Sequence, residues 1–246
     1  MDHLVYVAAS GARDVMVAQA TNAHNLANAS TSGFRGDLLL AQSAQLEGLG
    51  VGSRAYNAMP RTAIDTRIGT TNVTGVDLDI AINGEGWITV MGDNGTQQLS
   101  RRGDLRVNEL GQLLDGAGKK IVGSSGPIAL PPHSSVSIGS DGTISIVALG
   151  ESPNTLSVVD RIKLVKPDKN LLEKGPNGMV QVAAGQKLVA DDTVTVTSGS
   201  LESSNVQSVA AMVRMIELAR QHEGYVKLMK TAEELDRSSA QLMSMS

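Results

Sequence analysis

The sequence predicts an α+β protein. Long N- and C-terminal helices pair in a coiled-coil-like bundle, and a central antiparallel β domain, a barrel or a sandwich, separates them along the chain. Apolar residues at both ends recur with the alternating four-three spacing of packed helices. Those in the middle recur every second residue, in short runs that Gly, Asn and Asp turns separate. Strands grouped between helices, without strand-helix alternation, are typical of this class.

The N-terminal helix is expected over residues 2–30 and lacks charge over much of its length. Its stripe comprises Leu4, Ala8, Gly11, Val15, Ala18, Asn22 and Asn25. No Asp, Glu, Lys or Arg occurs between Val15 and Phe34. Because an isolated surface helix normally carries charge on its outer face, this span favours packing on several sides.

Ser204 and Gln207 form a capping-box pattern just before a periodic run, which predicts that the C-terminal helix begins there. The run that follows keeps a heptad seam with one polar break, flanked by residues such as Met212 and Ile216. The seam comprises Ala211, Met215, Leu218, His222, Tyr225, Met229 and Ala232. Gly224 weakens this helix by roughly 1 kcal/mol relative to alanine.

The middle of the chain has the two-residue period of strands. Residues 76–82 alternate apolar side chains with polar or small ones and end at an Asn-Gly turn, and residues 87–91 form a second apolar run. The glycine-rich stretch before them fits neither period and is expected to be extended. The predicted divisions are an N-terminal helix in residues 1–35, an extended connector in 36–75, the β domain in 76–199 and a C-terminal helix in 200–246.

Composition excludes several classes of function. The 246 residues include no Cys, which excludes disulfide frameworks, thiolate zinc sites and cysteine nucleophiles. A net charge of -4, with both signs interspersed, gives no footprint for nucleic acid or anionic lipid. No run of 18 apolar residues occurs, and the first Lys or Arg is Arg13, so neither a membrane span nor a secretory signal peptide is predicted.

Signatures of enzymes are incomplete. Residues 113–120 resemble a phosphate-binding loop but lack its first glycine and the Ser or Thr after its lysine, so a β-turn is favoured. Asp77 and Asp79 would share a strand face at about 7 Å, a separation that paired carboxylates can use. Alternating carboxylates more often mark a solvated strand face. The four His are scattered. We therefore expect no catalytic residue, no cofactor and no metal.

Three segments resemble the signatures of flagellar axial proteins. Residues 24–35, His-Asn-Leu-Ala-Asn-Ala-Ser-Thr-Ser-Gly-Phe-Arg, resemble an N-terminal signature with Asn-Asn-Leu-Ala-Asn, a Thr and Gly-Phe-Lys or Gly-Phe-Arg, although His24 departs at the first Asn. Residues 81–87 are similar to Ala-Ile-x-Gly-x-Gly-Trp/Phe, which opens the family's β domain, and residues 199–206 to Gly-x-Leu-Glu-x-Ser-Asn-Val. Both ends of the chain look most like proximal rod members of the family, with distal rod members as the nearest competitor.

The resemblance implies a structural subunit of the bacterial flagellar basal-body rod. Such a subunit polymerises through its terminal helices into the tubular drive shaft that transmits torque and lets exported subunits pass. Its implied partners are copies of itself, other rod proteins and the flagellar type III export apparatus, and its implied location is the periplasm, reached without a cleaved signal peptide. The residues expected at the assembly interface are Leu4, Val15, Asn22, Asn25, Leu26, Met215, Leu218, Tyr225 and Met229.

Several alternatives stay open at this point. The two terminal helices could pack into an ordinary intramolecular hairpin instead of packing between subunits. Within the family, the chain could be a distal rod subunit. It could also be an export or adaptor protein that binds helical partners transiently, or a peptidoglycan-acting enzyme that uses Asp77 and Asp79.

Overall fold

The computed structural model describes residues 2–45, 55–92, 94–152, 155–175, 177–183 and 186–244. The chain divides into two compact units. One comprises residues 1–27, 37–63 and 207–246, and the other comprises residues 28–36 and 64–206. We call them the helical unit and the β unit and describe each by itself.

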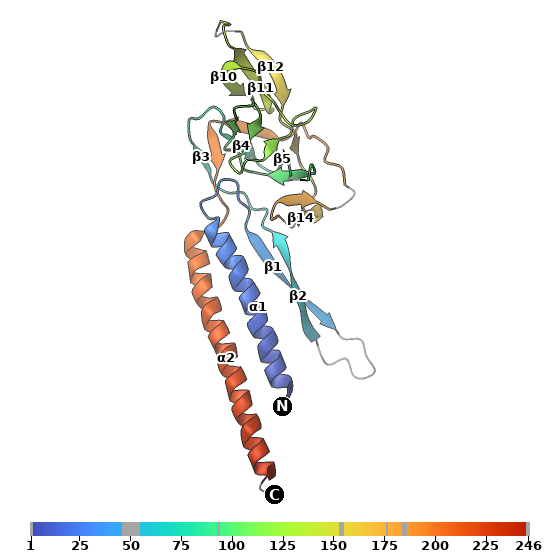
Figure 1. Ribbon diagram of the computed structural model, residues 1–246, viewed down its shortest axis with the longest axis vertical. Helices are drawn as coiled ribbons and strands as arrows, with labels where there is room; N and C mark the ends of the chain where they lie inside the picture. The colour runs from blue at the N-terminus through green and yellow to red at the C-terminus, as the bar shows by residue number, and fades with distance from the viewer. Residues whose placement is uncertain are drawn as a thin grey trace. The chain divides into compact units, whose positions relative to one another are not determined.

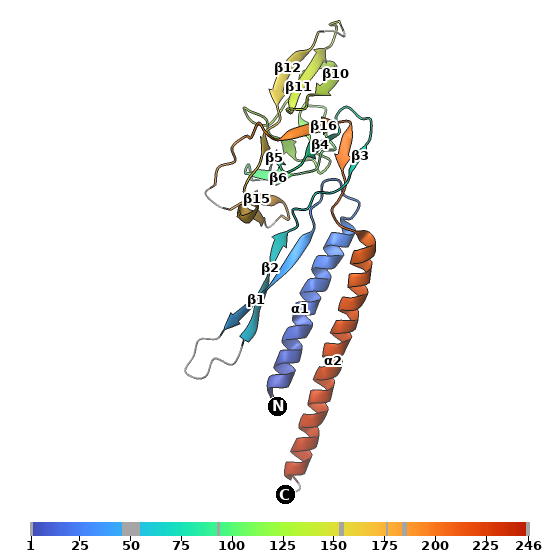
Figure 2. The ribbon, with the colours of Figure 1, turned by 180° about the vertical axis from the view of Figure 1, so that it is seen from behind.

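The helical unit contains two antiparallel helices, α1 (Asp2–Ala27) and α2 (Ser208–Ser244), which lie side by side (Figures 1 and 2). Two paired strands, β1 (Asp37–Gln45) and β2 (Ala55–Ile64), complete it. The helix α2 starts at Ser208, after the predicted capping box, because the Ser204 hydroxyl accepts the Val206 N–H in a local turn instead of capping a helix.

The β unit is built from short antiparallel ladders. Its largest sheet has eight strands in the order β14-β15-β6-β5-β9-β8-β7, with β13 also paired to β5. These strands are β5 (Trp87–Met91), β6 (Gln97–Ser100), β7 (Arg106–Val107), β8 (Leu113–Leu114), β9 (Lys120–Ile121), β13 (Leu164–Val165), β14 (Leu172–Lys174) and β15 (Val180–Val182).

The β unit also contains smaller sheets. A three-stranded sheet has the order β10-β11-β12, and two further pairs are β16-β4 and β17-β3. The bounds are β3 (Thr71–Val73), β4 (Ile80–Asn83), β10 (His133–Ile138), β11 (Thr143–Ala148), β12 (Ser157–Arg161), β16 (Thr195–Ser198) and β17 (Ser200–Glu202), with a 3₁₀ turn η1 (Lys169–Leu171).

Aliphatic side chains form the main core of the β unit. Ile80, Ile88, Leu113, Ile121 and Ile144 all have 0% of their surface exposed. A second, smaller cluster packs Leu99, Val165 and Val180 around Trp87. Burying each such side chain stabilises the fold by about 1.5–3 kcal/mol, so a chain with a single Phe and a single Trp still has a substantial core.

The α+β class predicted from the sequence is wrong. The chain is β-rich, with one eight-stranded antiparallel sheet and four smaller sheets in the described residues. The helices there number two and form a single pair, not a bundle. The physical reason is the shortness of the strands: ladders of two to six residues close many small sheets in the β unit instead of one barrel or sandwich. The range predicted as an extended connector, residues 36–75, contains β1, β2 and β3.

Candidate assembly site

The faces of α1 and α2 that meet carry small and aliphatic side chains. We call these buried residues the inner seam: Ala8, Ala12 and Val15 on α1, and Ala211, Leu218 and Ala232 on α2. Gly11 widens the space available on α1, because a Cβ atom there would lie 2.5 Å from a ring carbon of Tyr225. Only glycine therefore lets the Tyr225 ring pack this closely against α1.

Two asparagines add polar contacts to the apolar seam. Asn22 Nδ2 donates to the backbone oxygen of Ala211 on α2 at 2.8 Å. Asn25 pairs with the backbone of Asp37 in both directions, since its Nδ2 donates to the Asp37 oxygen at 2.9 Å and its Oδ1 accepts the Asp37 N–H at 2.8 Å. The first bond joins the two helices, and the second pair joins the end of α1 to the start of β1.

Of the residues predicted for assembly, Val15 and Leu218 belong to the inner seam, and the others lie elsewhere on the same two helices. Val15 and Leu218 are buried, while Asn22, Asn25, Leu26, Met215, Tyr225 and Met229 are half-buried. The side chain of Leu4 lies outside the described residues. The structure thus brings the predicted α1 and α2 residues together within one chain, which is the hairpin arrangement left open above. Their role between subunits stays a prediction.

The opposite face of α2 carries apolar residues that the prediction of assembly residues missed. Val209, Met212, Val213 and Ile216 follow the i, i+3, i+4, i+7 spacing of one helix face and have between 51% and 73% of their surface exposed. We call them the outer stripe. Periodicity favoured the seam because it continues to Ala232, whereas the outer face becomes charged after Ile216, from Arg220 onward.

The outer face of α1 is similarly apolar. Tyr6 and Val17 lie opposite the seam residues and are 62% and 38% exposed, and Val7 and Met16, 60% and 57% exposed, flank them on the two sides of the helix. Within the uncharged span between Val15 and Phe34, Met16 and Val17 remain exposed, so burial inside the chain does not explain all of it. Large side chains of this kind on both helices are typical of a surface that meets other molecules.

A buried ion cluster joins sequence-distant motifs inside the β unit. The Glu202 carboxylate accepts from Arg35 Nη2 at 2.5 Å and from Arg101 Nε at 2.7 Å, and it also accepts the Gly69 N–H at 2.8 Å. All three charged side chains are at most 3% exposed. Arg101 also donates to the carbonyl oxygen of Gly86 and to those of two other residues in the 81–87 motif. Burial lowers the pKa of the Arg101 guanidinium and nearby Arg35 lowers it further, while Glu202 opposes this.

Backbone geometry explains two other motif residues. Gly33 has a φ of +65°, and a Cβ there would lie 2.2 Å from the Arg101 carbonyl carbon, so the Gly-Phe-Arg motif requires its glycine. Asn205 accepts the Gly36 N–H at 2.8 Å and donates to the Asp65 and Arg67 oxygens, both at 3.0 Å. The backbones of the first and third sequence motifs are also bonded directly, since the Gly33 N–H donates to the Glu202 carbonyl oxygen at 2.7 Å.

The structure also places the carboxylates considered for catalysis. Asp79 Oδ2 accepts a hydrogen bond from the Thr74 hydroxyl at 2.6 Å, and the side chain of Asp77 is exposed. The shared strand face expected for these two residues does not form, because Asp77 lies in a turn, Asp79 is at an isolated bridge to Asp104, and β4 begins only at Ile80. Among the described residues, no group of three His, Asp or Glu side chains could hold a metal ion, and no helix could span a membrane.

The chain matches known proteins both through family models and over its full length. The family model described as "Flagellar basal body rod FlgEFG protein C-terminal" matches residues 197–242, and the one described as "Flagellar hook protein FlgE/F/G D1 domain" matches residues 81–146. Over 100% of both chains, the sequence is 36% identical to the flagellar basal-body rod protein FlgF of Salmonella typhimurium and 37% identical to that of Escherichia coli. It is 27% identical to the rod protein FlgG of Buchnera aphidicola, over 89% of this chain and 91% of the relative.

Proposed function

This chain belongs to the family of flagellar basal-body rod proteins, and we propose that its helical unit is the part that builds it into the rod. It is a structural subunit of the proximal rod, since the full-length relatives with higher identity are FlgF proteins. The weaker FlgG match leaves the distal rod as a minor alternative. The resemblance seen in the three sequence motifs is confirmed.

One observation carries the assembly proposal: the outer stripe of α2 and the outer face of α1 expose large apolar residues on helices already paired through their inner seam. Covering a surface of this kind against neighbouring rod subunits removes its apolar area from water at about 25 cal/mol per Å². The inner seam then acts indirectly. Residues such as Leu218 and Tyr225 hold the two helices in one unit, so that both outer faces are presented together.

The proposed mechanism is mechanical. Torque passes between subunits through packed helix faces, and no bond is made or broken, so we propose that the chain is not an enzyme. The exposure of Asp77 and the hydrogen bond that the Thr74 hydroxyl donates to Asp79 Oδ2 support this proposal. Copies of this chain and other rod proteins are the proposed neighbours. By the family resemblance, the flagellar export apparatus delivers the chain to the periplasm without cleavage of a signal peptide.

Substitution within the outer stripe tests the proposal. Ile216→Asp places a charge on an exposed side chain, so the chain should fold, but burying that charge between subunits costs several kcal/mol. We expect strongly reduced incorporation into purified basal bodies and loss of swimming. Thr231→Asp, an exposed position on the charged part of α2, is the matched control and should assemble normally. Normal incorporation of Ile216→Asp would contradict the proposal.

A further inference from the structure

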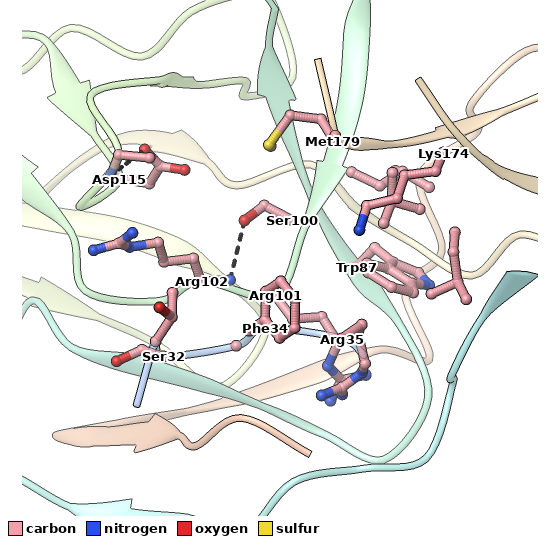
Figure 3. Close-up of a pocket in the computed structure, with 17 residues that line it drawn as sticks. Ser32, Phe34, Arg35, Trp87, Ser100, Arg101, Arg102, Asp115, Lys174 and Met179 are labelled. Carbon is pink, nitrogen blue, oxygen red and sulfur yellow. Dashed lines mark hydrogen bonds between the residues drawn. The ribbon is translucent and has the colours of Figure 1, made fainter. Parts of the chain in front are cut away.

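Methionine side chains differ in exposure between the two units of the chain. The structure describes those of Met16, Met91, Met179, Met212, Met215 and Met229. Met16 on α1 and Met212 on α2 are 57% and 51% exposed, and the other four are half-buried. Figure 3 shows one of these four, Met179, among the side chains that line a cavity of the β unit. Among the described methionines, the two exposed thioethers thus both belong to the helical unit, on the outer faces of α1 and α2.

Met212 is one of the four residues of the outer stripe. Its neighbours one turn away along the stripe are Val209 and Ile216, whose side chains carry no hydrogen-bond donor. A thioether suits such a surface, because it is apolar and adapts its shape to a partner. Its sulfur is also the atom that peroxides oxidise, and the ease of oxidation follows exposure. The side chain that would be covered by a neighbouring subunit is therefore open to oxidation in the free chain.

We propose that Met212 is an oxidation site whose sulfoxide keeps the outer stripe from packing against a neighbouring subunit, and that Met16 is the corresponding site on α1. The oxidant is a peroxide. A lone pair of the sulfur attacks one peroxide oxygen, an S–O bond forms, and the O–O bond breaks. The sulfur loses two electrons, and the second oxygen leaves with both protons of hydrogen peroxide as water. The inference rests on the proposed function, because the sulfoxide matters only where the stripe is covered.

The added oxygen changes what the stripe can bind. A sulfoxide is polar, and its oxygen accepts hydrogen bonds that a thioether sulfur makes only weakly. On the free chain water supplies the donor, so the fold itself is unaffected. Between packed helices the aliphatic neighbours of Met212 supply none, and a buried acceptor without a donor should weaken the contact between subunits at least about fivefold. Enzymatic reduction of the sulfoxide restores the thioether, so the effect is reversible.

Peptide mapping of the full chain after treatment with hydrogen peroxide measures oxidation at each site. Trypsin cleaves after Arg214, so Met212 and Met215 are recovered in separate peptides, residues 188–214 and 215–220. Met215 is the matched control, because it lies on the same helix but is half-buried. Mass spectrometry should show that Met212 gains one oxygen several-fold faster than Met215 in the free chain, and that this difference is lost in purified basal bodies. Equal rates at Met212 and Met215 in the free chain would overturn the proposal.

Two variants test the effect on assembly in cells. Met212→Gln places a polar group of similar length at this exposed position and should lower incorporation into basal bodies several-fold, whereas Met212→Leu stays apolar, contains no sulfur and should incorporate normally. Normal incorporation of Met212→Gln, or an equal loss in Met212→Leu, would overturn the proposal. Ile216→Asp separates this result from failure of the proposed function. Normal incorporation of Met212→Gln alone contradicts the oxidation site, and normal incorporation of Ile216→Asp as well contradicts assembly through the outer stripe.

Discussion

Replacing Glu202 by glutamine leaves two buried guanidinium groups around a neutral side chain. Arg35 and Arg101 are 2% and 3% exposed and both bond the Glu202 carboxylate. Removing one partner of a buried ion pair costs about 3–5 kcal/mol, because the remaining charge is left uncompensated. A protein domain has about 5–15 kcal/mol of stability in total. Glu202→Gln should therefore remove a large part of the stability of the β unit.

A second variant gives this prediction its sharpest form. Arg35→Met also breaks the cluster, but Glu202 keeps its bonds to Arg101 at 2.7 Å and to the Gly69 N–H at 2.8 Å. The loss should be nearer that of one charged hydrogen bond, about 1.5–3 kcal/mol. Urea unfolding followed by the emission of the single Trp measures both. A cost for Glu202→Gln within about 1 kcal/mol of zero, or a larger cost for Arg35→Met, would refute the reasoning.

Three further predictions concern the two helices and the buried Asp115. Gly224→Ala should stabilise α2 by about 0.5–1 kcal/mol, because an added Cβ there meets no atom within 4 Å. Gly11→Ala should not stabilise α1 unless Tyr225 is also replaced by Ala, because the added Cβ meets the Tyr225 ring. Thermal unfolding followed by circular dichroism compares the two single variants, and equal gains in stability would show that the close packing of Gly11 and Tyr225 is unimportant. Leu218→Asp buries a charge in the inner seam and should lower helical ellipticity and incorporation into rods while leaving tryptophan emission unchanged; motile rods built from it would contradict this. Burial raises the pKa of Asp115 above its usual 3.8, although backbone hydrogen bonds from Lys119 and Ala117 lower it. The folded chain therefore holds a proton that the unfolded chain has lost, and the free energy of unfolding falls as pH rises from 3.8 to the raised value. Asp115→Asn has no such titration, so urea unfolding should show its stability rising relative to the wild type over that window, and parallel pH profiles would refute this prediction.

Local patterns in the sequence predicted the helices well. Periodicity placed α1 over residues 2–30, and the structure has it over Asp2–Ala27. It also identified the inner seam, since Val15 and Leu218 are buried. Periodicity alone does not say which molecule covers a seam, and here α1 and α2 of one chain cover each other. The outer stripe is shorter than the seam, so periodicity did not predict it as an assembly surface. The sequence pattern identifies Met212 and Ile216 only as residues that flank the seam.

Long-range pairings could not be predicted from the sequence. Arg35 and Glu202 are separated by 167 residues, and nothing in the composition of either segment selects the other as its partner. The burial of Asp115 could not be predicted either. The sequence predicts the β-turn that contains this residue, but other strands supply the side chains that bury its Oδ2. The class of the fold was missed for a related reason, because strand number and sheet order follow from non-local pairing.

The central claim is that the outer faces of the two helices are buried between subunits in the rod. Electron microscopy of an intact basal body, at a resolution that shows side chains, tests it most directly. We expect Val209, Met212, Val213 and Ile216 each to be covered by helices of neighbouring subunits, while Leu218 still packs against its own α1. A map in which these four side chains face solvent, or in which α1 and α2 of one chain are separated, would contradict it.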